Sequence, residues 1–167
     1  IDYFEIDRGG DLTYHGPGQL VCYPIFDLNN YYLDSHRYLR DLEEAVMMTL
    51  KDFGIDSSRD EQYTGVWIKD EKICSIGIKI SRWITMHGLA LNVNNELSYF
   101  DKIIPCGIFH KGVTSIKKIK GEVIDINMVM DFMSKNFQKV FSLNIERIKR
   151  EELFDYYKIN SDRFSLI

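Results

Sequence analysis

The sequence predicts an α+β domain whose sheet is mostly antiparallel and flanked by helices. Three apolar, strand-like runs follow one another at 64–69, 72–80 and 82–93, and two segments with helical periodicity lie at 34–53 and 125–141. Strands joined by such short connections pair as antiparallel hairpins, and helices set outside the hairpins are typical of α+β domains. The 167 residues contain no repeat and no linker rich in Pro, Gly or Ser, so we expect one domain.

The composition is that of an ordinary globular protein and excludes several classes. Hydrophobic residues make up 45% and charged residues 28%, which excludes a disordered or collagen-like chain. Lys plus Arg number 21 against 25 Asp plus Glu, a formal net charge of −4, which gives no electrostatic case for nucleic acid. No apolar run reaches the roughly 18 residues of a membrane span. We therefore expect neither nucleic acid nor a membrane as partner.

The first segment with a clear character is the glycine-rich stretch 7–19, DRGGDLTYHGPGQ. Its four glycines and one proline in thirteen positions predict a structured loop whose main chain a ligand can approach closely. The run that follows, LVCYPIF at 20–26, predicts a buried strand.

The first of the two predicted helices has start and stop signals. Asp34 or Ser35 can cap the helix of 34–53, apolar residues recur at steps of three and four, and Gly54 ends it. The second helix, from about Asp125 to Phe141, has a similar apolar face that we expect to pack in the core, its methionines included. The apolar residues are Leu39, Leu42, Val46, Leu50 and Phe53 in the first helix, and Ile126, Val129, Met130, Met133, Phe137, Val140 and Phe141 in the second.

Lys72 lies in the predicted hairpin of 64–80, and its role can be interpreted in two ways. The pair Asp70–Glu71 predicts a tight turn, so Lys72 begins the second strand. Position alone favours an exposed lysine that protects a strand edge. A lysine that takes part in chemistry is the alternative.

The three cysteines differ in their surroundings. An odd, sparse set argues against a disulfide framework and for a reducing compartment. Cys22 and Cys74 lie within strand-like runs, where a thiol is usually a small buried hydrophobe. Cys106 lies between Pro105 and Gly107, at a bend where a thiol can face a cleft, although a structural role is equally compatible.

Histidines and lysines leave two further alternatives open. His15 and His87 both have glycine neighbours, so each is either a polar site residue or a loop brace. With Cys106 and His110 they permit a zinc site, but no CxxC or HExxH motif supports one, and we expect no metal. The segment 110–120 holds four lysines and no carboxylate, so it is either a solvated face or a patch for an acidic protein partner.

Four blocks form a joint pattern. The first is RGGDLTYHGPGQLVCY at 8–23; the others are KICSIGIKISRW at 72–83, TMHGLALNVN at 85–94 and LSYFDKIIPCGI at 97–108. Together they resemble one family, the lipoyl(octanoyl) transferases of lipoate biosynthesis. The similarity covers roughly residues 5–120. Members usually begin with a further strand, helix and acidic-His-Pro segment, and this sequence, which opens at Ile1, is expected to lack that part.

The resemblance implies the fold of the biotin and lipoate protein ligases and an octanoyl transfer. Octanoate would pass from acyl carrier protein to a lysine of lipoyl domains, those of the 2-oxoacid dehydrogenases and of the glycine cleavage H protein, with no cofactor. The family's nucleophile maps to Cys106 and its lysine partner to Lys72, with His87 in support. The segments that map to substrate contacts are Arg8, Gly9, Gly10, Asp11, Leu12, Thr13, Tyr14 and His15, then Ser75, Ile76 and Gly77, then Gly88, Leu89 and Ala90.

The implied chemistry has physical requirements. A cysteine divides a transfer between two protein partners into two steps, and its attacking form is the thiolate, which a cationic Lys72 would favour. Backbone N–H groups must stabilise the oxyanion of each tetrahedral intermediate, and we predict those of Gly77 and Gly88. The acyl chain needs an apolar slot, which the glycine loop and the strand around Ser75 could form.

Three rival functions remain. An ATP-dependent lipoate or biotin ligase of the same fold would need no cysteine nucleophile. A non-catalytic module would bind acyl carrier protein or lipoyl domains through the lysines of 110–120. An amidotransferase would relay the acyl group between lipoyl domains. We expect the compartment to be the cytoplasm if the source is a bacterium, or the matrix or stroma of an organelle if it is a eukaryote.

Overall fold

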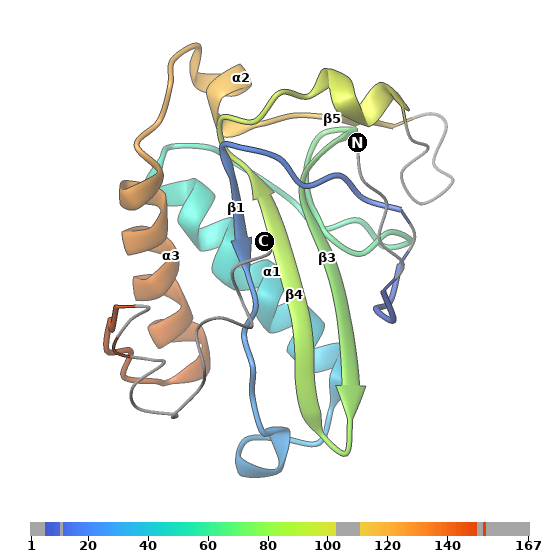
Figure 1. Ribbon diagram of the computed structural model, residues 1–167, viewed down its shortest axis with the longest axis vertical. Helices are drawn as coiled ribbons and strands as arrows, with labels where there is room; N and C mark the ends of the chain where they lie inside the picture. Colours follow the sequence, from blue (N-terminus) through green and yellow to red (C-terminus); the bar gives the residue numbers. More distant parts are fainter. Residues whose placement is uncertain (1–5, 11, 103–110, 150–151, 153–167) are drawn as a thin grey trace.

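The computed structural model describes residues 6–10, 12–102, 111–149 and 152. Its elements form one sheet with two long helices packed together beside it (Figure 1). The strands are β1 (Gln19–Cys22), β2 (Val66–Ile68), β3 (Glu71–Ser81), β4 (Ile84–Asn92) and β5 (Gly112–Val113). The helices are α1 (Ser35–Asp52), α2 (Ile116–Lys120) and α3 (Ile126–Phe141), and two short 3-10 turns span Leu28–Asn30 and Ser98–Lys102.

The sheet has the order β1-β4-β3-β2, and every pair in that path is antiparallel. The short β5 adds a parallel pairing to the start of β3, with Lys72 opposite Val113. Gly77 of β3 faces Gly88 of β4 near the middle of the longest pairing. The predicted α+β class with a mostly antiparallel sheet is confirmed.

Helices α1 and α3 supply most of the core on one side of the sheet. The predicted cap of α1 is confirmed, because the Asp34 side chain accepts from the Arg37 amide; at the start of α3 the Asp125 side chain accepts from the Asn127 amide. Their apolar faces meet each other and the strands in one cluster. Met133 is buried there, but Met130 lies 37% exposed, so the prediction that it packs in the core is wrong. Among the described residues, no helix has the length and hydrophobicity that crossing a bilayer requires.

Two predictions of strands and turns need correction. The strand of 20–26 ends at Cys22, and Tyr23 and Ile25 are more than half exposed. Since β1 lies at the sheet's edge, its alternate side chains face outward, and Pro24, which has no amide hydrogen, follows the strand. The β2–β3 turn is formed by Lys69 and Asp70 rather than by Asp70–Glu71, and Lys69 takes the left-handed conformation (φ 53°) that such turns require.

The close approach of the end of β1 to Gly88 leads to a prediction for stability. A Cβ added to Gly88 would lie 2.2 Å from the Cys22 carbonyl oxygen and 2.6 Å from Cδ of Pro24. Gly88→Ala should therefore lower the free energy of unfolding by about 3 kcal/mol, as overpacking in a core does. Urea denaturation measures this loss.

Gly54 offers the matched control. It has a positive φ, 71°, and an added Cβ would meet nothing within 4 Å, so an alanine there brings backbone strain without a clash. Gly54→Ala should cost about 1 kcal/mol of backbone strain. If Gly88→Ala were no less stable than Gly54→Ala, the close approach of β1 to Gly88 would be refuted.

Candidate functional site

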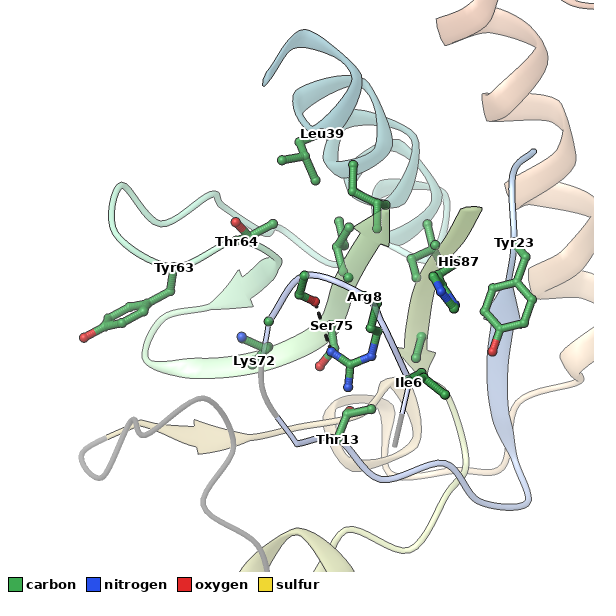
Figure 2. Close-up of a pocket in the computed structure, with 18 of the residues that line it drawn as sticks. Ile6, Arg8, Thr13, Tyr23, Leu39, Tyr63, Thr64, Lys72, Ser75 and His87 are labelled. Carbon is green, nitrogen blue, oxygen red and sulfur yellow. Dashed lines mark hydrogen bonds between the residues drawn. The ribbon is translucent and has the colours of Figure 1, made fainter. Parts of the chain in front are cut away.

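A cavity of about 500 Å³ lies where the glycine loop crosses β3 and β4. Its walls come from the loop of residues 6–15, the pocket-facing parts of the two strands, the segment 62–64 and the first turns of α1 (Figure 2). Lys72 and Ser75 lie on one wall, and Tyr63 and Thr64 lie across from the glycine loop. Such volume and mixed lining are typical of small-ligand sites.

The structure brings most of the predicted site residues to this cavity. Those that line it are Arg8, Gly9, Gly10, Leu12, Thr13, His15, Lys72, Ser75, Ile76, Gly77, His87, Gly88, Leu89 and Ala90. Tyr14 is not among its described lining residues; its ring stacks on Tyr99 at 5.0 Å between centroids and meets Phe100 edge-on. Asp11 and Cys106 lie outside the described residues.

Gly77 is what allows the loop to lie so close to the sheet. A Cβ on Gly77 would lie 2.7 Å from the Gly9 carbonyl oxygen, and the Gly9 amide donates to the Ile78 carbonyl at 2.9 Å. The bare backbone of β3 therefore serves as the floor on which the loop rests.

The β3–β4 register argues against the predicted oxyanion donors. The two-residue turn makes Ser81 and Ile84 a hydrogen-bonded pair, and antiparallel pairs alternate, so Gly77 and Gly88 also bond each other. The Ile78 carbonyl, one position on, points away from β4 and accepts from Gly9, as this alternation requires. The Gly77 and Gly88 amides are thus used within the sheet, and the prediction that they hold an oxyanion is not supported.

Lys72 lies inside the protein, with 8% of its surface exposed. The β2 strand pairs with β3 on one side of it and β5 joins at the same position, so the exposed strand-edge interpretation is wrong. Its Nζ lies 4.7 Å from the centre of the Trp67 ring. A buried indole face favours an ammonium ion by cation–π attraction.

The two histidines of the cavity have different settings. His15 Nδ1 lies 2.8 Å from Oε1 of Gln19, whose amide nitrogen donates to Asn92 on β4 at 2.9 Å. His87 Nε2 lies 3.5 Å from the Asp7 carboxylate, and its backbone has a positive φ of 61°. Strain of that kind in a non-glycine residue is common at ligand sites. Over the described ranges no three His, Cys, Asp or Glu side chains form a metal-binding group.

Comparisons with known proteins identify the family. Residues 1–138 match the family described as lipoyl protein ligase A/B catalytic domain. A relative from Cytophaga hutchinsonii named octanoyltransferase is 52% identical over 150 residues, which cover 86% of this chain and 62% of the relative. The octanoyltransferase of Caldanaerobacter subterraneus is 51% identical, over 88% of this chain and 64% of its own length.

The chain belongs to the lipoyl protein ligase A/B family. The predicted resemblance is thereby confirmed. This family member spans a little under two thirds of the length of these two curated relatives.

Solved structures confirm the fold expected of the lipoyl protein ligase A/B family. A lipoate-protein ligase A bound with ATP matches with a TM-score of 0.65 at 16% identity, over 96% of this chain and 70% of that one. A putative lipoate protein ligase of Thermoplasma acidophilum with bound lipoic acid gives 0.63 at 17%, over 96% and 71%. A biotin protein ligase of Aquifex aeolicus gives 0.56 at 17%, over 88% and 58%.

Two of the three cysteines of this lipoyl protein ligase A/B family member are described, and neither is an activated thiol. Burial raises the pKa of Cys22 to about 11, and burial also raises the pKa of Cys74. Both thiols therefore stay protonated near neutral pH, and a buried Cys74 confirms the small-hydrophobe interpretation.

The lysines of 110–120 are less available than the sequence indicates. Lys111 pairs with Asp60 at 2.5 Å, and Lys118 pairs with Glu71 at 2.6 Å. The Lys111 ammonium also lowers the pKa of Asp60 through their hydrogen bond. These pairs within the chain reduce the charge that a patch for an acidic partner would offer.

Sequence reasoning missed the wall formed by Gln62, Tyr63 and Thr64, and the indole under Lys72. One signal for the indole exists: a two-residue hairpin turn between Ile68 and Glu71 places Trp67 opposite Lys72. The wall itself lies in an irregular segment, where no periodicity marks a residue as facing a ligand.

Proposed function

We propose that this chain is an octanoyltransferase that passes an octanoyl group from acyl carrier protein to a lysine of a lipoyl domain, through a thioester on Cys106. The observation that carries the proposal is the buried Lys72 in a cavity floored by Gly77 and roofed by the glycine loop. The named octanoyltransferase relatives, at about 50% identity, support the same reaction.

In the first step the Cys106 thiolate attacks the octanoyl carbonyl of the carrier thioester. A carbon–sulfur bond forms to Cys106, the carrier's carbon–sulfur bond breaks, and the carrier leaves as a thiolate that takes up a proton. One thioester replaces another, so the step needs no ATP. An ammonium at Lys72 favours the attacking thiolate over the thiol.

In the second step the amine of the lipoyl-domain lysine attacks the acyl-enzyme. A carbon–nitrogen bond forms, the bond to Cys106 breaks, and one proton leaves the nitrogen. Lys72 can accept that proton once its own proton has passed to the departing carrier thiolate in the first step. Amide formation from a thioester runs downhill.

The cavity has room and surfaces for the acyl chain. Its apolar lining includes Leu39, Ile78 and Ile80 as well as Leu89. Each methylene removed from water contributes about 0.8 kcal/mol, so the chain itself supplies much of the binding. For the oxyanion we propose backbone amides of the glycine loop in place of the paired strand glycines.

Intact-mass analysis tests the proposal. The protein is incubated with octanoyl acyl carrier protein without ATP or Mg²⁺, and then with a lipoyl domain. We expect the protein to gain one octanoyl group and to lose it to the lipoyl domain.

Each rival predicts a different result. Modification of the lipoyl domain only with free octanoate, ATP and Mg²⁺ would establish a ligase. Binding of the carrier without any mass gain would establish a non-catalytic module. Acyl gain from an octanoylated lipoyl domain, but not from the carrier, would establish an amidotransferase.

A further inference from the structure

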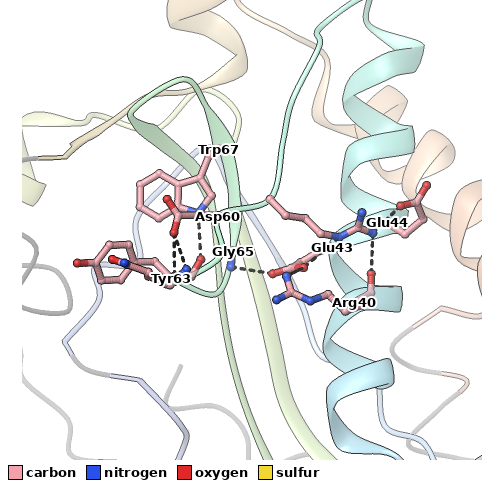
Figure 3. A network of polar contacts seen from close by, with 9 residues as sticks. Arg40, Glu43, Glu44, Asp60, Tyr63, Gly65 and Trp67 are labelled. Atoms are coloured by element: carbon pink, nitrogen blue, oxygen red, sulfur yellow. Dashed lines mark hydrogen bonds and ion pairs between the residues drawn. The ribbon is translucent and has the colours of Figure 1, made fainter.

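Glu43 is a buried carboxylate on α1 that is not among the described residues lining the cavity. Its side chain is 1% exposed, and Figure 3 shows it between α1 and the segment that leads into β2. One oxygen lies 2.7 Å from Arg40 and 3.2 Å from Arg59. Burying a charge lowers the free energy of unfolding even when the charge is paired, so a carboxylate at this position indicates a functional role.

The other oxygen of Glu43 holds the backbone of Gly65. The Gly65 amide donates to Oε1 of Glu43 at 3.1 Å. Gly65 has a φ of 131°, and a Cβ there would lie 2.6 Å from the Cys74 carbonyl oxygen. That same Cβ position lies 3.5 and 3.6 Å from Cε and Cδ of Lys72. Glu43 thus fixes a stretch of backbone that lies beside the stem of Lys72.

Trp67 supports the other end of the same side chain. Its ring lies under Nζ of Lys72, and its indole nitrogen donates to the Tyr63 carbonyl at 3.2 Å. The backbones of Trp67 and Ser58 exchange two hydrogen bonds of 2.9 Å. Gly65 and Trp67 therefore flank Lys72, and both belong to one segment, 58–67.

A second ion pair ties this segment down beyond Glu43. Lys111 lies 2.5 Å from Asp60 and 4.7 Å from the centre of the same Trp67 ring. Asp60 also accepts from the amides of Gln62 and Tyr63 at 2.8 and 3.0 Å. Asp60 thus holds the amides of Gln62 and Tyr63, whereas Glu43 holds the amide of Gly65, which lies beside the Lys72 stem.

We propose that Glu43 is a positioning residue for Lys72, acting through Gly65 without touching the substrate. The inference rests on the proposed function only in giving Lys72 a part in acyl transfer. Loss of the Glu43 carboxylate releases the Gly65 amide and lets the backbone at Gly65 move away from the Lys72 stem. The Lys72 amine can then take a wider range of positions.

The test compares Glu43→Ala with Asn136→Ala. Asn136 is also 1% exposed and bonds to Thr49 and Asp52 of α1, away from Lys72. Trace labelling of the Lys72 amine with acetic anhydride, read by mass spectrometry, reports its accessibility without any need for activity. Urea denaturation shows whether the two variants lose similar stability, and single-turnover acylation reports the reaction.

Glu43→Ala should raise the rate of Lys72 labelling about fivefold. The loss of one buried hydrogen bond changes a local equilibrium by about that factor, and the labelling rate follows the fraction of molecules in which Lys72 is accessible. Acylation of the enzyme should slow about tenfold or more, because a small displacement of a reacting group is costly. Asn136→Ala should change neither, despite a comparable loss of stability.

Equal labelling of Lys72 in both variants and in the unaltered protein would overturn the inference. If Glu43→Ala does not fold, Arg59→Met, which removes one partner of Glu43, should raise labelling in the same direction by a smaller factor, and no change would again refute it. If Glu43→Ala alters the labelling of Lys72 but the unaltered protein is not acylated by the carrier, the positioning role is supported and the proposed function is refuted.

Discussion

Cys106→Ala should abolish formation of the octanoyl-enzyme and lower the rate of transfer to the lipoyl domain by at least about 10³-fold, since no other nucleophile takes over a covalent route. The two other thiols cannot substitute, because burial raises the pKa of both Cys22 and Cys74. Intact-mass analysis and a transfer assay measure the loss.

Cys22→Ala is the matched control. Cys22 is half-buried in β1, and its side chain is not among the described residues of the cavity. This variant should still gain one octanoyl group. Acylation that persists in Cys106→Ala and disappears in Cys22→Ala would move the nucleophile to β1 and contradict the proposed route.

Lys72→Met should slow acylation of the enzyme by about 10- to 10³-fold near neutral pH, the effect of removing one nearby cation from an ionising group. Methionine replaces the apolar stem of the side chain as far as Cε, so packing beside Gly65 and Trp67 is largely retained. The loss should therefore reflect charge more than shape.

The pH dependence of iodoacetamide alkylation at Cys106 separates the effect of the Lys72 charge from the effect of its shape. A neighbouring ammonium lowers a thiol's pKa, so the thiolate persists to lower pH; without Lys72 the alkylation midpoint should rise toward about 8.5 or above. Lys118→Met, which removes a lysine paired with Glu71, should leave the midpoint unchanged. Identical profiles for Lys72→Met and the unaltered protein would remove Lys72 from the proposed mechanism.

The helices could be predicted well because local signals agree with tertiary structure. For α1 and α3 the capping aspartates Asp34 and Asp125 and the apolar periodicity all indicate the same bounds. The short α2 carries the right signals as well, a capping Ser115 and a left-handed Gly121, but five residues are too few for periodicity to show. Its lysines therefore suggested only a charged surface.

The site was harder to predict wherever it depends on contacts between distant segments. The family blocks indicated the glycine loop and the strands around Ser75 and Gly88, and the cavity gathers them. The burial of Lys72 depends on β5, a two-residue strand whose Val113 pairs with Lys72 from 41 positions later in the chain (113 − 72). No local pattern distinguishes a lysine covered in this way from one at an open edge.

The placement of the two tryptophans has a practical consequence. Trp67 is 2% exposed beneath two ammonium groups, whereas Trp83 is 37% exposed at the tip of the β3–β4 hairpin. Their emission should differ in wavelength, and the buried indole is the one that contacts Lys72, a residue that lines the cavity. The fluorescence of Trp67 should therefore report the charge of the ammonium groups beside the cavity, and the solvent-facing Trp83 serves as an internal reference.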